Sequence, residues 1–245
     1  MKSTGTLILV LVLLLSVSVV QSAPARPGHP APPAARTDVY HVFFAKAALG
    51  KSGQYDDFLK TPPDPSAPMA THRLVLRHQD GDSWDFVVIQ HLGTKATVEA
   101  AGTPPPANAR DLVDWHNDTF VNGPSWPEFT KQMGIAEDSV SKSGGSVYVV
   151  SVYRAAAGHR DALEKQLGTP PPTDGSDTSS GNVLMQHLEG GPWQYLTIAR
   201  YNSWQDFATN ESNATAKADK GSGGWFQLRD EASFHNDTIT TRIAP

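Results

Sequence analysis

The sequence predicts an α+β protein that contains two copies of one unit, each with the element order strand, helix, strand, strand, helix. Self-similarity is the first observation behind this prediction, and the alternation of apolar residues within each block is the second. Three blocks recur in the same order: VYHVFFAKAALG at 39–50 with VYVVSVYRAAAG at 147–158, HQDGDSWDFVVI at 78–89 with HLEGGPWQYLTI at 187–198, and RDLVDWHNDT at 110–119 with RDEASFHNDT at 229–238. Conserved order with drift in the intervening lengths indicates an internal duplication.

Each copy opens with a run of β-branched and aromatic residues, at 39–46 and at 147–154, which predicts a strand. A glycine follows each run, and a short helix is expected after it, at 51–60 and at 159–167.

Two further strands follow in each copy, joined by the hairpin turns QDGDS and LEGGP. Thr94 and Ser203 come directly after the second of them and are suitable N-caps for another helix. The expected strands are 73–79 with 84–92 in the first copy, and 182–188 with 193–201 in the second.

The last piece of each copy carries the repeated His-Asn-Asp-Thr, and the spacing of its apolar residues predicts a helix. This interpretation places the histidine on the apolar face, directed toward the core. The stripes are Ala109, Val113, His116 and Phe120 in the first copy, and Leu228, Ala232, His235 and Ile239 in the second. A strand that begins at the histidine is the alternative.

Alternate residues divide the strands into two faces. One face is apolar in both copies, and we expect it to lie under the helices: Tyr40, Val42, Phe44, Val87, Ile89, Tyr148, Val150, Val152, Leu196 and Ile198. The other face mixes aromatic and polar residues, which is a poor surface to leave in water. We therefore expect the two units to bury these mixed faces against each other, sheet to sheet, around a semi-polar interior.

This element order is that of a ferredoxin-like βαββα(β) unit. A tandem of such units, each ending in a helix with a histidine and a polar cluster, resembles the dimeric α+β barrel superfamily, fused in one chain over residues 38–245. The resemblance implies an intramolecular α+β barrel. It also implies relatives among cofactor-free monooxygenases, haem-degrading enzymes, haem proteins similar to chlorite dismutase, and stress-responsive proteins.

The domain organisation follows from composition. Lys2 precedes an apolar run at 7–20 that is too short to span a membrane, which predicts a cleaved export signal at 1–22. The predicted parts are that signal, a Pro/Ala-rich tether at 23–37, a first α+β repeat at 38–121, a linker at 122–146 and a second repeat at 147–245. The mature protein is expected to be exported, either periplasmic or secreted.

Charge and cysteine content exclude several classes of function. The net charge is −5 and there are no basic clusters, which argues against nucleic-acid partners. The chain has no cysteine, so its stability must come from its core rather than from disulfides.

A pocket between the two sheets is the leading hypothesis for a site. Such a pocket would take a small apolar or aromatic molecule. The candidate lining residues are Arg77, Trp84, Gln90, Tyr153, Gln186, Trp193 and Tyr195, and His41 is the best candidate for a catalytic base or a haem ligand. His41 is favoured because the second copy has Val149 at the matching position, so the pocket would be asymmetric and only the first half would supply this imidazole. Plain packing is the alternative for His41, and core anchoring is the alternative for both tryptophans.

The repeated polar residues form a second candidate set: His78, Arg110, His116, Asn117 and Asp118 with His187, Arg229, His235, Asn236 and Asp237. If the histidines of strand and helix approach each other, a divalent metal would suit them. A buried histidine bonded to a backbone carbonyl explains the repeat without a metal, and we predict none. The recurring Arg-Asp pair could recognise an anion or form a structural ion pair.

Three functions remain open at this point: a barrel that binds a small molecule, a monooxygenase-like or haem-binding enzyme, and a non-enzymatic module whose interior is filled by aromatic residues. No cofactor is expected, with haem as the runner-up.

Overall fold

The structure is a computed structural model that describes residues 35–64, 71–94, 107–135, 145–188 and 191–245, all within one compact unit spanning 32–245. The strands are β1 (Asp38–Ala47), β2 (Arg73–Asp80), β3 (Phe86–Gly93), β4 (Val113–Gly123), β5 (Val147–Ala155), β6 (Gly181–His187), β7 (Tyr195–Tyr201) and β8 (Ala232–Ala244). The helices are α1 (Ser52–Lys60), the 3-10 helix η1 (Ala107–Leu112), α3 (Trp126–Met133), α4 (Arg160–Leu167), α5 (Trp204–Ala218) and α6 (Gly224–Glu231). The predicted helices at 51–60 and 159–167 and the first three strands of each copy are confirmed.

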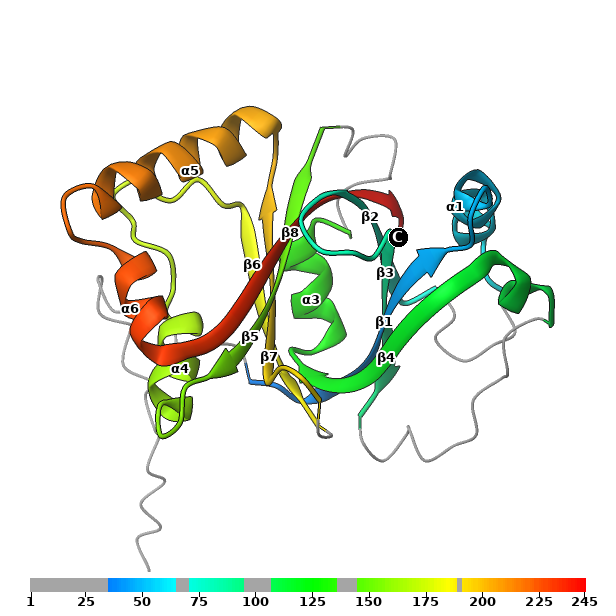
Figure 1. The fold of residues 1–245 in the computed structure, drawn as a ribbon, viewed down its shortest axis with the longest axis horizontal. Helices are drawn as coiled ribbons and strands as arrows, with labels where there is room; N and C mark the ends of the chain where they lie inside the picture. The colour runs from blue at the N-terminus through cyan, green and yellow to red at the C-terminus, as the bar shows by residue number, and fades with distance from the viewer. Residues whose placement is uncertain (1–34, 65–70, 95–106, 136–144, 189–190) are drawn as a thin grey trace, which may run out of the picture. The chain divides into compact units, whose positions relative to one another are not determined.

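The strands form one closed antiparallel barrel in the order β1-β3-β2-β8-β5-β7-β6-β4 (Figure 1). Within each half, the fourth strand lies beside the first, and the third lies between the first and the second. The halves meet edge to edge at two seams, β2 with β8 and β4 with β6. Closure pairs the outer strands of each half with those of the other, along most of β2 and at two positions of β4.

The repeated His-Asn-Asp-Thr lies on a strand in both halves, and the prediction of a helix there is wrong. β4 pairs with β1 from Asp38 opposite Gly123 to Ala47 opposite Val113, and β8 pairs with β5 in the corresponding way. The helical spacing rested on few apolar residues. Backbone hydrogen bonds to β1 and to β5, along almost their whole length, favour the strand instead. The motif therefore forms a barrel wall, and the alternative considered for it is the correct one.

The barrel interior is filled by the face that was expected to lie under the helices. Tyr40, Val42 and Phe44 of β1 pack in one cluster with Tyr148 and Val150 of β5. The helices cover the other face instead. Tyr55 and Leu59 of α1 pack on Ala45, Val75 and Phe86 in one half, and Leu163 of α4 packs on Tyr153 and Tyr195 in the other. The alternation of residues along the strands assigns side chains to the two faces correctly. Both faces carry large apolar side chains, however, so hydrophobicity alone does not show which face turns toward the barrel interior.

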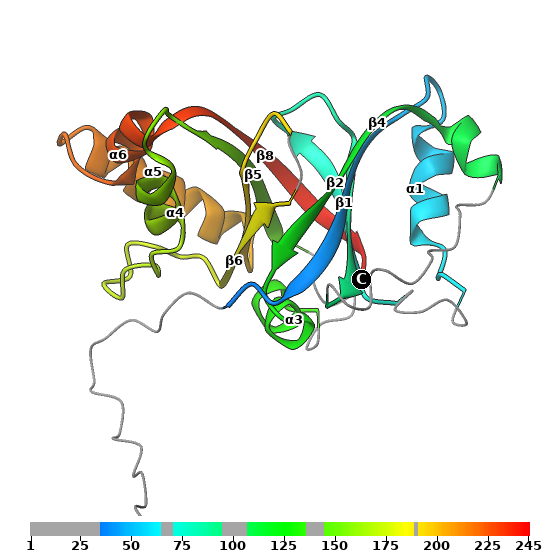
Figure 2. The same ribbon diagram turned by 90° about the horizontal axis from the view of Figure 1, so that it is seen from below.

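Helix α3 closes one end of the barrel, although the sequence placed it in a linker (Figure 2). Its Phe129 and Met133 are fully buried in the interior cluster. Two interior tyrosines hold the helix in place through hydrogen bonds: Tyr40 Oη donates to Pro124 O at 2.7 Å, and Tyr148 Oη donates to Met133 O at 3.0 Å.

The two remaining helix predictions, after Thr94 and after Ser203, have different outcomes. Ser203 caps α5 as predicted, since its side chain accepts a hydrogen bond from the Asp206 N–H. The helix expected after Thr94 falls on residues outside the described ranges. No helix in the described part of the chain is long and apolar enough to span a membrane.

Candidate functional site

The residues predicted to line an interior pocket are spread over different surfaces of the barrel. Trp84 and Trp193 lie inside it and are only 4% and 6% exposed, so they act as core anchors. The others, His41, Arg77, Gln90, Tyr153, Gln186 and Tyr195, belong to the opposite, outward face of their strands. The expectation that they share one pocket between the sheets is therefore corrected.

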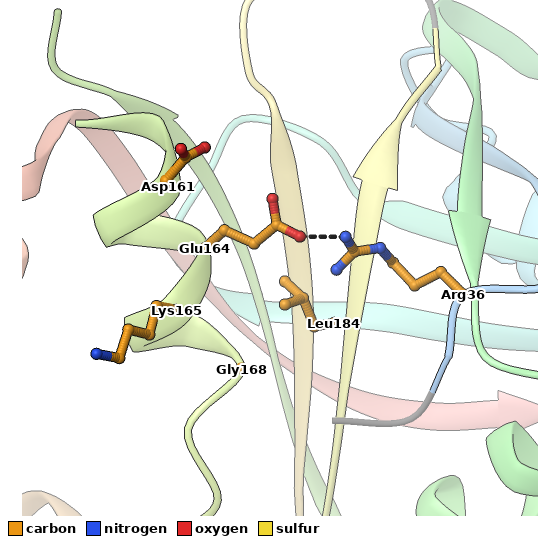
Figure 3. A pocket seen from close by; sticks show the side chains of 6 residues that line it. All are labelled: Arg36, Asp161, Glu164, Lys165, Gly168 and Leu184. Carbon is orange, nitrogen blue, oxygen red and sulfur yellow. Dashed lines mark hydrogen bonds and ion pairs between the residues drawn. The ribbon is translucent and has the colours of Figure 1, made fainter. Parts of the chain in front are cut away.

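A cavity of about 350 Å³ lies on the outside of the barrel, between α4 and the outward face of the second half (Figure 3). Its polar walls come from α4 and from the segment that precedes β1, and its apolar surface comes from β6. The lining residues are Arg36, Asp161, Glu164, Lys165, Gly168 and Leu184.

Glu164 is the centre of the polar network at this cavity. One carboxylate oxygen, Oε1, pairs with the Arg36 guanidinium, and the other, Oε2, accepts a hydrogen bond from Tyr195 Oη at 2.7 Å. Arg36 also donates to Gln186 Oε1 at 3.3 Å, and Arg160 Nε donates to Tyr195 Oη at 3.4 Å. Two of the predicted ligand-binding residues, Gln186 and Tyr195, are thus brought together here.

The network sets the protonation states of its members. Burial opposes ionisation of Glu164, but hydrogen bonds from Arg36 and Tyr195 and the charge of Arg36 outweigh it, and its pKa is lowered. Burial, and next the hydrogen bond to Glu164, raise the pKa of Tyr195. At neutral pH the site therefore presents an ionised carboxylate and a phenol that remains a donor.

Arg36 and Glu164 were missed by sequence reasoning. Arg36 belongs to the segment interpreted as a tether, and nothing in that Pro/Ala-rich stretch indicates a contact with α4. A signal for Glu164 did exist. At the offset of 108 it matches Asp56 of α1, which pairs with Lys60 and lies 3.5 Å from Arg77. An acidic residue recurs at one helical position above the same sheet face in both copies.

His41, the predicted catalytic residue, forms a separate pair on the outward face of the first half. Its Nε2 lies 3.1 Å from Asp118 Oδ2, and its ring packs near Phe43 and Phe120. The pairing engages the nitrogen that would ligate an iron, so this arrangement does not fit a haem ligand and we derive no step through haem.

The strand histidines and the motif histidines do not approach each other. His78 and His187 point into the barrel and contact Trp84 and Trp193, whereas His116 points outward against Phe43. His187 bonds to Thr119 Oγ1 and to the Trp193 carbonyl, which is the structural role considered for it.

The other motif residues also have separate surroundings. His235 Nε2 lies 3.6 Å from Asp237 Oδ2, and the Arg229 guanidinium stacks on Trp225. Asn117 and Asn236 lie within the paired parts of β4 and β8, and the side chain of Arg110 is outside what the structure describes. Within the described ranges, no three His, Asp or Glu side chains are placed to hold a metal ion.

Solved structures with the same fold provide the comparison with known proteins. A proposed monooxygenase from Fusobacterium nucleatum subsp. nucleatum is 8% identical over 84% of this chain and 93% of its own, with a TM-score of 0.54. An anthrone oxidase-like protein is 11% identical over 85% of this chain and 92% of its own, also with a TM-score of 0.54. No protein-family model and no curated protein matches the sequence. At such low identity the likeness establishes an α+β barrel fold.

Proposed function

We propose that the protein binds a small aromatic molecule that carries a hydroxyl group, in the cavity between α4 and the outward face of the second half. One observation carries the proposal: the ionised Glu164 carboxylate is held by Arg36 and Tyr195 in the wall of a cavity that also presents Leu184. The site replaces the interior pocket that the sequence suggested.

The chemistry of the wall selects the ligand. A carboxylate has about four acceptor positions and a guanidinium has five N–H donors, so Glu164 and Arg36 retain capacity beyond their mutual bonds. A ligand hydroxyl can donate to Glu164 and accept from Arg36, while an aromatic ring covers Leu184. A volume of about 350 Å³ is near the lower end of the range for small-molecule pockets, which favours one to three fused rings.

Binding of 1-naphthol, measured by titration calorimetry, tests this proposal. Glu164→Gln removes the charged acceptor and Tyr195→Phe removes the donor that holds it. Loss of a hydrogen bond to a charged group costs about 1.5–3 kcal/mol, so we expect roughly 10- to 100-fold weaker binding for Glu164→Gln. Asp161→Asn is the matched control, because Asp161 lines the same cavity and should leave the affinity within about twofold. Equal affinities for wild type and Glu164→Gln would reject the site.

A monooxygenase-like activity at the same site is the second candidate, supported by the fold shared with the two proteins described above. The substrate would be an anthrone-type ring with an enolisable CH₂ group. Glu164 would accept a proton from this carbon, and O₂ would oxidise it. One oxygen atom would become the new carbonyl and the other would leave as water with the two hydrogens.

Oxygen consumption in the presence of anthrone separates oxidation from binding alone. One O₂ per ketone formed, above the rate without protein and reduced in Glu164→Gln, would support the enzyme. Binding without O₂ uptake would leave a binding protein.

We further infer that the two halves are duplicated ferredoxin-like units and that residues 1–22 direct export. The shared strand order within the halves and the recurring sequence blocks support the duplication. Secreted protein whose first residue is Ala23 would support export, and retention of Met1 on the mature protein would contradict it.

A further inference from the structure

Three polar side chains join in series beside α3, at the end of the barrel that this helix closes. His91 Nε2 lies 2.8 Å from Asp38 Oδ2, and His91 Nδ1 lies 3.1 Å from His72 Nδ1. Asp38 Oδ2 also accepts the backbone N–H of Trp126 at 3.1 Å, and the Trp126 ring stacks on His72 and His91, with centroids 4.7 and 5.3 Å apart. The cluster thus links β1, β3, the residue before β2 and the start of α3.

The tautomers follow from this geometry. An ionised carboxylate only accepts, so His91 must carry its hydrogen on Nε2 and present a lone pair on Nδ1. His72 must then donate from Nδ1. A first added proton can be held at His72 Nε2 without disturbing either bond. A second proton requires hydrogens on both Nδ1 atoms, which face each other, and the bond between the rings is lost.

We propose that Asp38, His91 and His72 form an acid-sensitive clasp that holds α3 over the end of the barrel and opens when both imidazoles are protonated. Opening would free Trp126 from its stacked position, and with it the N-terminal end of the helix that carries Phe129 and Met133 into the interior. Acid would thereby loosen the packing of α3 on the barrel interior.

The surroundings favour this response. Asp38 is the acidic group that faces the imidazoles, Tyr40 contacts His91 from β1, and α3 presents Trp126. Arg73, next to His72, is turned away toward the Leu59 and Thr61 carbonyls. The pKa of His72 is lowered, first by burial and then by the charge of His91, as expected if the doubly protonated state is disfavoured.

The clasp is confined to one half of the barrel. At the offsets that align the two copies, the positions of Asp38, His72 and His91 are taken by Ser146, Gly181 and Arg200. The second half has no histidine pair at these matching positions, so the acid response belongs to the attachment of α3 to the first half.

Histidine NMR on the full chain tests the clasp directly. At pH 7.5 we expect His91 as the Nε2–H tautomer and His72 as the Nδ1–H tautomer. On acidification His72 should titrate below the ordinary histidine value of about 6.5, and the Trp126 indole signal should shift with the second protonation step of the histidine pair. An Nε2–H tautomer of His72 at pH 7.5, or a Trp126 signal that ignores this step, would overturn the proposal.

A variant gives an independent measurement. A depressed folded-state pKa means that the unfolded chain binds more protons below pH 6.5, so wild type should lose stability as the pH falls through that region. His72→Phe keeps the ring stack but cannot take up the proton, and its melting temperature should fall less between pH 7.5 and pH 5. His116→Gln, which changes an exposed outward histidine, should behave as wild type. An equal loss in wild type and His72→Phe would reject the clasp.

Discussion

The outward faces of the two halves differ in the residues at two aligned positions. Where the first half has Phe86 packed against Tyr55, the second has Tyr195, whose hydroxyl donates to Glu164. Where the first half has Arg77 on β2, the second has Gln186, and the cation is supplied instead by Arg36. An apolar contact between helix and sheet is thereby converted into a polar cavity wall.

Glu164→Gln should lower the free energy of unfolding by about 1 kcal/mol at pH 7, since a part-exposed ion pair and one hydrogen bond are weakened. The lowered pKa of Glu164 fixes the sign of the pH dependence. Its contribution is complete above the pKa of the unfolded chain and disappears as the pH falls through the folded-state pKa. Urea unfolding between about pH 7 and pH 3 would measure this. Asp161→Asn is the control, and a difference that persists unchanged in acid would contradict the assignment.

Sequence reasoning reached part of this site. Tyr195 and Gln186 were found because strand alternation groups side chains by face, and that grouping was correct. The pairing of Arg36 with Glu164 was not found because it joins residues far apart in the sequence, and no local pattern in the Pro/Ala-rich segment indicates it.

At the scale of elements, α3 is the part whose position depends on unusually close packing. Gly181, at the start of β6, faces the Gln132 carbonyl, and an added Cβ would lie 1.8 Å from that oxygen. Gln132 also accepts the Asn182 N–H through its side chain at 3.1 Å. The end of the helix therefore rests directly on the strand backbone.

Gly181→Ala should destabilise the fold by about 1–3 kcal/mol, the usual cost of inserting a methyl group into a packed contact. Gly53→Ala in α1 is the matched control, because an added Cβ meets nothing within 4 Å and should be neutral or stabilising by up to about 1 kcal/mol. Thermal unfolding compares the two. If both substitutions have the same effect, α3 does not pack on β6 as described.

The elements show where prediction from sequence succeeds. Runs of β-branched residues bounded by turns gave six strands correctly, and Ser203 marked its helix start. The helix predicted at the repeated His-Asn-Asp-Thr was wrong because three apolar residues and the histidine fit a helical period, while the partner strands β1 and β5, distant in sequence, determined the outcome. α3 failed because Pro and Gly around 122–134 suggested a linker, whereas Gly134 (φ 65°) ends a helix.

At the scale of the whole barrel, the two seams differ in extent. β2 pairs with β8 from Val75 opposite Ala244 to Asp80 opposite Ile239, with two register shifts on the way. β4 and β6 are in register only at Val121 opposite His187 and at Asn122 opposite Gln186. The barrel should therefore open first between β4 and β6.

Amide hydrogen exchange should reveal this difference. The amides that cross the β4–β6 seam, such as Leu188 N–H bonded to Phe120 O, should exchange faster than those that cross the β2–β8 seam. Equal protection of the amides at the two seams would mean that the barrel does not open first between β4 and β6.

The proposed ligand site lies outside the barrel, between α4 and the outward face of the second half. Backbone amide chemical-shift mapping with saturating 1-naphthol tests it most directly. We predict that the largest shifts occur at Arg36, Glu164, Leu184 and Tyr195, with little change at the interior residues Leu74, Val42 and Ile198. Shifts centred on those interior residues, with none along α4, would place the ligand inside the barrel and reject the outer site.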